Sequence, residues 1–144
     1  MGDTQPIYLD NNATTPVDVR VAEIVNRYLL EEYGNAGSRT HSWGTAAAKA
    51  SENARRQIAE PVDASPDEIV LTSGATESNN LAILGIADHA KSTGRTHIIT
   101  TAVEHHAVLE PVEALVERGF EATILPVTEQ GWATPEDLAA ALRP

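Results

Sequence analysis

The segment from Thr72 to Asn80, which reads TSGATESNN, carries the residues of this sequence that could most directly do chemistry. It follows a short run of β-branched and aliphatic residues and leads into a helical pattern, with Gly74 at the turn. Free N–H groups at a helix start, the positive end of the helix dipole and the Thr76 hydroxyl can together bind a phosphate. A well-capped helix after a tight turn would explain the same residues. The segment therefore predicts a candidate anion site.

Two histidines follow the next expected strand, which ends in the segment Thr101 to His106. They would lie at the carboxyl edge of a sheet, where α/β folds place their ligands. Because successive strand residues point to opposite faces, only one of His105 and His106 can face a cleft, and we assign that position to His105. An imidazole can lie against an aromatic ligand and exchange a proton near neutral pH. The alternative is a polar residue that satisfies loop carbonyls.

The elements that must position these residues alternate between helical and extended patterns, which is typical of an α/β fold. We expect an extended piece at 7–9, strands at 68–72, 97–103 and 122–127, and helices from Pro16 to about 32, at about 43–60, 75–90 and 107–118, and from Pro135 onwards. Short connections between strands and helices favour parallel pairing with right-handed crossovers. The prediction is a mainly parallel sheet with helices on both faces and no internal domain boundary.

Several local signals support these elements. Gly34 stands where a left-handed cap would end the first helix, and Gly119 does so after the helix at 107–118. The apolar run from Leu81 to Ala87 predicts an interior helix that is buried on most sides. Asn11 and Asn12 are best explained as turn formers that hold the entry to the first helix.

Composition excludes several classes of protein. Lys and Arg number 10 against 21 Asp and Glu, and the net charge of −11 disfavours binding to nucleic acid or to an anionic membrane surface. The 144 residues, 42% of them hydrophobic, predict one globular domain. Cysteine is absent, which excludes disulfides, thiolate metal sites and a cysteine nucleophile within these residues. We expect a cytoplasmic protein, because no secretory signal and no membrane-spanning run occurs.

Metal and nucleotide binding find little support in the sequence. The five histidines have no His-x-x-x-His or His-Glu-x-x-His spacing, so we assign no metal site. A Gly-x-Gly-x-x-Gly turn and a Walker loop are also absent.

Taken together, the motifs resemble pyridoxal-5′-phosphate-dependent cysteine desulfurases of the class V aminotransferase superfamily. The matching segments are YLDNNATTP at 8–16, GN at 34–35 with SRTH at 38–41, EIVLTSGATESN at 68–79 and EH at 104–105. Their order and spacing agree across essentially the whole chain. The resemblance is closest to the branch that serves iron–sulfur assembly and thiolation.

This resemblance implies a fold type I homodimer in which L-cysteine condenses with the cofactor and an enzyme cysteine takes the sulfur as a persulfide, leaving L-alanine. Residues 1–144 would form the N-terminal portion of the cofactor-binding large domain, with 1–15 as an arm towards the small domain. Ala75 and Thr76 match the phosphate-binding pair, and His105 matches the residue that stacks on the pyridine ring and acts as acid–base. A sulfur-acceptor protein is the implied partner, in an iron–sulfur, tRNA-thiolating or DNA-phosphorothioating system.

The sequence departs from the family where covalent chemistry is needed. The family holds its cofactor on a lysine in a Ser-x-His-Lys context, which neither Lys49 nor Lys91 fits. The aspartate facing the pyridine nitrogen, the glutamine facing the ring oxygen and the loop with the persulfide cysteine are missing too. We therefore expect about the first third of such an enzyme, with no covalent cofactor link and no activity alone. An open sheet of three strands predicts self-association or pairing with a second fragment.

Other functions stay open at this point. A selenocysteine lyase, a kynureninase-like hydrolase or an aminotransferase would share the superfamily, and a non-catalytic binding or interaction domain would retain the fold without turnover. Arg39 and His41 lie in a loop that the family places near the active site at the dimer interface. Loop stabilisation explains these two residues as well as a functional role does.

Overall fold

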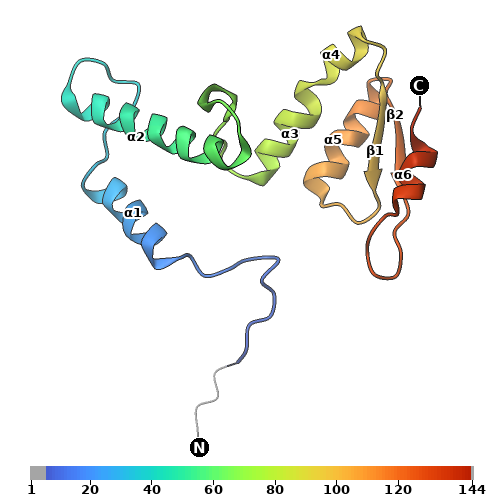
Figure 1. Ribbon diagram of the computed structural model, residues 1–144, viewed down its shortest axis with the longest axis horizontal. Helices are drawn as coiled ribbons and strands as arrows, with labels where there is room; N and C mark the ends of the chain where they lie inside the picture. The colour runs from blue at the N-terminus through green and yellow to red at the C-terminus, as the bar shows by residue number, and fades with distance from the viewer. Residues whose placement is uncertain (1–5, 144) are drawn as a thin grey trace, which may run out of the picture. The chain divides into compact units, whose positions relative to one another are not determined.

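The computed structural model of the protein describes residues 6–143. The chain divides into two compact units, Met1–Val70 and Leu71–Pro144. The first unit contains α1 (Val19–Leu30), α2 (Ser42–Ala59) and the 3-10 turns η1 (Glu60–Val62) and η2 (Pro66–Glu68) (Figure 1). The second unit contains α3 (Ala75–Gly85), α4 (Ala87–Ser92), β1 (His97–Thr101), α5 (His106–Glu117), β2 (Glu121–Leu125) and α6 (Pro135–Ala141). Helices combined with a parallel strand pair confirm the α/β prediction. One domain without an internal boundary stays a prediction, as does the role of 1–15 as an arm, of which 1–5 lie outside the described residues.

The first helix begins later than the sequence predicts. Asp18 is its N-cap, and the Asp18 carboxylate accepts a hydrogen bond from the backbone N–H of Arg20 at 2.9 Å and pairs with the Arg20 guanidinium at 2.8 Å. The expected start at Pro16 is therefore wrong, because a carboxylate that bonds the first turn is an effective cap. The turn before it is confirmed, since the N–H of Ala13 bonds the carbonyl of Asp10 at 3.1 Å across Asn11 and Asn12.

Gly34 serves close packing instead of a left-handed cap. It does not share the positive φ angle found at Gly94, Gly119 and Gly131, so the predicted role is wrong. A Cβ atom built on Gly34 would collide with the backbone carbonyl of Trp43. The chain therefore needs glycine there because another segment approaches the backbone, which is a contact that local sequence patterns do not report.

In the second unit, β1 and β2 form a parallel pair in which Ile98 lies opposite Ala122 and Thr100 opposite Ile124. The chain crosses from β1 to β2 through α5, as parallel pairing requires. In Figure 1, α3 and α5 lie to one side of the two strands and α6 lies to the other. Helices on both faces of a parallel sheet are thus confirmed for this pair.

The core of the second unit lies between the strands and the helices on the α5 side. Ala87, Leu115 and Phe120 are buried there, and Ile83, Leu84 and Ile98 pack against them. Leu115 is only 1% exposed. Among residues 6–143, no helix is long and apolar enough to cross a membrane.

The segment at 68–72 is not a strand, so the predicted third strand is wrong. Ile69 has extended dihedral angles, but no described segment pairs with it, and its carbonyl accepts a hydrogen bond from the Arg55 guanidinium. Extended backbone becomes a strand only when a neighbour supplies the ladder of hydrogen bonds. The described residues therefore form a sheet of two strands where the sequence predicts three.

The helix expected at 75–90 is broken, and it is not an interior helix. It divides into α3 and α4 at Ile86, and α3 contains no buried residue. Leu81 is 52% exposed and Ile86 58% exposed. The apolar run is covered on one side only, where α3 packs against α5.

The later elements agree closely with the sequence. Pro111 is accommodated within α5, and Gly119 follows that helix with a φ of 90°, as a left-handed cap requires. In α6, the Thr134 hydroxyl accepts a hydrogen bond from the N–H of Asp137, and the Asp137 carboxylate accepts one from the N–H of Thr134. These three features depend on short-range interactions, which a sequence pattern records directly.

Replacing Leu115 with alanine should destabilise the second unit. Deleting a fully buried leucine side chain costs its transfer free energy and leaves a cavity, so Leu115→Ala is expected to lower the free energy of unfolding by about 2 kcal/mol or more. Urea unfolding followed by circular dichroism measures this change. The matched control is Leu142→Ala, whose side chain is 65% exposed and whose loss should change the stability by less than about 0.5 kcal/mol. Equal stabilities of the two variants would contradict the placement of the core.

Candidate functional site

The N-terminus of α3 is open, unlike the start of most helices in this protein. Its N-cap is Gly74, and no side chain caps it. The other α-helices that follow a loop are capped by the side chains of Asp18, His41, His105 and Thr134. Because the first N–H groups of a helix have no intrahelical partner, those of Ala75 and Thr76 are free to bind a ligand. A Cβ atom built on Gly74 would meet no other segment within 4 Å.

Side chains from within α3 hold the turn that precedes it. The Glu77 carboxylate accepts hydrogen bonds from the Ser73 hydroxyl at 2.6 Å and from the Ser73 N–H at 2.7 Å. These bonds lower the pKa of Glu77 below its ordinary value, so the group is ionised at neutral pH. The hydroxyls of Thr72 and Ser78 lie 2.6 Å apart, and each is 3.2 Å from the carbonyl of Gly74.

His105 caps α5 instead of lying on a strand. β1 ends at Thr101, so the expectation that strand alternation separates His105 from His106 is wrong. Nδ1 of His105 accepts a hydrogen bond from the N–H of Ala107 at 3.0 Å, so the proton of the neutral ring is on Nε2. The two imidazole rings meet edge-on, with centroids 6.2 Å apart and an interplanar angle of 71°. The alternative drawn from the sequence is a polar side chain that donates to loop carbonyls. This contact is different, because His105 accepts a hydrogen bond from a backbone amide.

Thr76 and His105 lie at the same end of a packed pair of helices. α3 packs against α5, and both helices begin on the side to which the β1 arrow points (Figure 1). Thr76 is in the first turn of α3, and His105 immediately precedes α5. The carboxyl end of β1 directs the start of α5 to this side, and α3, which follows no strand among the described residues, is held beside it by packing against α5. The assignment of Ala75, Thr76 and His105 to one binding site stays a prediction.

Lys91, the lysine of the second unit, lies at the other end of the helix pair. Lys91 Nζ donates a hydrogen bond at 2.7 Å to the carbonyl of Arg118, after the last turn of α5, and lies 5.5 Å from the centroid of the Phe120 ring. Lys49 belongs to α2, in the other unit. Within residues 6–143, no three acidic or histidine side chains gather as they would around a metal ion.

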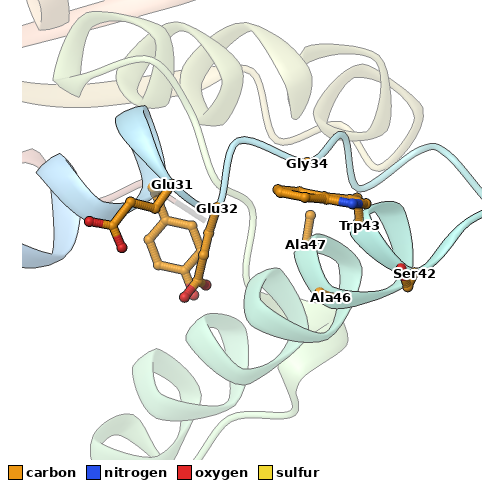
Figure 2. Close-up of a pocket in the computed structure, with 8 residues that line it drawn as sticks. Glu31, Glu32, Gly34, Ser42, Trp43, Ala46 and Ala47 are labelled. Carbon is orange, nitrogen blue, oxygen red and sulfur yellow. The ribbon is translucent and has the colours of Figure 1, made fainter.

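The first unit contains a groove of about 320 Å³ that sequence reasoning did not identify. In Figure 2 the indole of Trp43 lies between Gly34 and Ala47, while Glu31 and Glu32 line the other side. Trp43 also stacks on Tyr33, with ring centroids 5.3 Å apart. The only sequence signal for this groove is Trp43, which begins the apolar stripe of the helix expected at about 43–60. No Lys or Arg is among the lining residues, and Arg27, which pairs with Glu32 at 3.4 Å, offsets one of the two carboxylates, so the groove offers little attraction for an anionic cofactor.

The loop residues singled out from the sequence lie just before α2. Nδ1 of His41 accepts a hydrogen bond from the N–H of Gly44 at 3.1 Å, so His41 is the N-cap of α2. Stabilisation of the local chain therefore explains His41. Arg39 lies in the same loop, two residues earlier.

A model of the family described as aminotransferase class V matches residues 7–144. The chain belongs to the class V aminotransferase family. This membership confirms the resemblance that the motifs indicate. It also identifies the segment TSGATESNN as part of a family sequence and not as a chance pattern.

Relatives within this family are named cysteine desulfurases. The chain is 55% identical over 139 residues to cysteine desulfurase IscS of Dechloromonas aromatica, covering 96% of this chain and 34% of the relative. The crystal structure of DndA from Streptomyces lividans matches with a TM-score of 0.80 and 52% identity, over 95% of this chain and 38% of that one. A structure described as SspA in complex with cysteine matches with a TM-score of 0.80 and 36% identity, over 92% of this chain and 38% of that one. The chain thus spans about a third of the length of these proteins.

Substitutions of His105 should separate its role as a cap from any role toward a ligand. His105→Ala removes the acceptor for the Ala107 amide and is expected to lower the free energy of unfolding by about 1 kcal/mol, whereas His105→Asn retains a capping oxygen and most of the stability. Urea unfolding measures both. His106→Ala, at the neighbouring exposed position, should change the stability by less than about 0.5 kcal/mol. A variant His105→Ala as stable as the unsubstituted protein would contradict the capping role.

Proposed function

We propose that the second unit holds the phosphate of pyridoxal phosphate at the N-terminus of α3, as part of an enzyme that removes sulfur from L-cysteine. The observation that carries the proposal is the uncapped helix start at Gly74, with the free N–H groups of Ala75 and Thr76 behind it. Family membership and the names of the relatives support the choice of ligand and substrate. The SspA structure was described with cysteine bound, which supports the same substrate class.

The residues at this helix start fit a phosphate. Backbone N–H groups and the positive end of the α3 dipole favour an anion there, and the Thr76 hydroxyl adds a donor. Gly74 keeps the approach free of side-chain atoms. Glu77, a negative charge in the first turn of α3, is bonded to Ser73 and is therefore directed back along the chain. Ala75 and Thr76 would hold the phosphate, as the sequence analysis predicts.

His105 would cover the pyridine ring of the cofactor and handle a proton at Nε2. While Nδ1 accepts the Ala107 amide, the neutral ring carries its proton on Nε2 and can act there only as a hydrogen-bond donor. A proton can be taken up at Nε2 or given up from it only when Nδ1 also binds a proton. The hydrogen bond to Ala107 must then break. Acid–base work by His105 is thus linked to the loss of a helix cap.

Bound pyridoxal phosphate supplies an electron sink for the α-carbon of the amino acid. Desulfuration also needs an amine that holds the cofactor and a thiolate that accepts the sulfur. The 144 residues contain no cysteine, and Lys91 is engaged with Arg118. We therefore expect this chain alone to bind the cofactor without a covalent link and to leave L-cysteine unchanged. The proposal includes a cytoplasmic homodimer, or a complementing fragment, that passes sulfur to an acceptor protein.

The activity is tested on the natural protein that carries this sequence. Release of L-alanine from L-cysteine, with the sulfur first found as a protein persulfide and then released as sulfide when an added thiol reduces that persulfide, is the expected result. Release of selenide from selenocysteine without action on cysteine would favour a selenocysteine lyase. Absence of turnover on both, with the cofactor retained, would favour a non-catalytic binding domain.

The substitution Thr76→Ala should weaken binding of the phosphate group. A hydrogen bond to a charged group contributes about 1.5–3 kcal/mol, so its loss should weaken affinity by about tenfold or more. The ligand to use is deoxypyridoxine phosphate, which lacks the reactive aldehyde and cannot modify lysines. Calorimetric titration measures the affinity, and amide NMR signals of Ala75 and Thr76 should shift on binding.

Two comparisons make this experiment specific. Thr76→Ser keeps the hydroxyl and should retain most of the affinity. Deoxypyridoxine without the phosphate should bind the unsubstituted protein and Thr76→Ala equally weakly. If both forms of the ligand bind the unsubstituted protein with the same affinity, the proposed phosphate site is wrong.

A further inference from the structure

We propose that Glu77 is a positioning residue, which holds the turn before α3 so that the amides of Ala75 and Thr76 are directed outward for the phosphate. This inference rests on the proposed function, because it concerns how the same site is held ready. Glu77 does not touch the ligand in this proposal. It acts through Ser73, the residue before the N-cap of α3.

The bond made by Glu77 is displaced by one residue from a capping box. In a capping box, the acidic side chain at the third helical position bonds the N–H of the N-cap residue. Asp137 does this in α6, where it bonds the N–H of Thr134. Glu77 is also the third residue of its helix, but it bonds the N–H of Ser73, one residue before the N-cap Gly74. The N–H of Gly74 is therefore left uncovered, and no side chain covers the N–H groups of Ala75 and Thr76, because the N-cap is glycine.

A second set of bonds fixes the direction of the Ala75 amide. The carbonyl of Gly74 accepts a hydrogen bond from the N–H of Ser78 at 3.1 Å. The Thr72 and Ser78 hydroxyls have two hydrogens between them: one bridges the pair, and the other can reach the same carbonyl. A trans peptide is planar, so its N–H points opposite to its C=O. Holding the Gly74 carbonyl towards the helix thus directs the Ala75 N–H away from the helix, where a phosphate would lie.

Charge alone predicts the opposite effect of Glu77 on the ligand. An ionised carboxylate in the first turn of α3 repels a phosphate at the same helix end, so its removal should tighten binding if repulsion were its only effect. If Glu77 positions the turn, its removal should weaken binding instead. Repulsion predicts tighter phosphate binding after Glu77 is removed, and positioning predicts weaker binding. Substitution of Glu77 therefore distinguishes the two explanations.

The experiment compares deoxypyridoxine phosphate with deoxypyridoxine, and the readout is the ratio of their affinities for each variant. Glu77→Ala frees the Ser73 turn and should lower this ratio by about tenfold, the effect of one hydrogen bond to a charged group. Glu77→Gln keeps an oxygen that can accept from Ser73 and removes the charge, so its ratio should equal or exceed that of the unsubstituted protein. In Glu77→Ala, the amide NMR signals of Ala75 and Thr76 should also shift less when the phosphate ligand binds.

Asp137→Ala is the matched control, because it removes a carboxylate clamp from the third position of α6 in the same unit. It should lower the stability in urea and leave the affinity ratio unchanged. A ratio in Glu77→Ala that is unchanged or raised, or one that falls equally in Asp137→Ala, would overturn the positioning role while leaving the phosphate site intact. Equal affinities of the two ligands for the unsubstituted protein would instead overturn the proposed function, and this inference with it.

Discussion

Parallel pairing of β1 with β2 is the constraint on which the rest of the second unit depends. Two parallel strands need a crossover, which α5 provides, and the crossover helix begins at the carboxyl end of the first strand. α3 packs against α5 and begins at the same end (Figure 1). The buried contacts of Leu115 and Phe120 with Ile98 hold this arrangement. The open start of α3 and the imidazole before α5 therefore lie at the same end of the packed helix pair.

What the sequence predicts well depends on neighbours in the chain. The left-handed Gly119 and the Thr134–Asp137 cap are short-range features, and α5, β1, β2 and α6 lie close to their expected positions. Several errors arise where a distant segment decides, whereas the later start of α1 is set by the local cap of Asp18. Gly34 is required by the backbone of Trp43, and residues 68–72 would become a strand only beside a neighbour that no described segment provides. The apolar run from Leu81 to Ala87 likewise does not indicate how many sides of its helix other elements cover.

The candidate site shows the same division. The types and spacing of Gly74, Thr76 and His105 predict donors and an imidazole at a sheet edge, and the motifs across the whole chain indicate the family. The cap formed by His105 and the bond from Glu77 to Ser73 could not be read in this way. Both interactions depend on which of several neighbouring backbone amides a side chain bonds. A shift of one residue changes which amide is capped, and sequence spacing does not distinguish the two cases.

The two helix starts at this end of the fold differ in whether a side chain bonds their first amides. α5 begins closed, with His105 bonded to the Ala107 amide, and gains stability from its cap. α3 begins open and gives up such a cap, and the bond between Glu77 and Ser73 offsets part of that loss without covering the amides. A ligand phosphate would supply the missing acceptor. In the proposed site, binding of the phosphate would therefore also complete the N-terminal cap of α3.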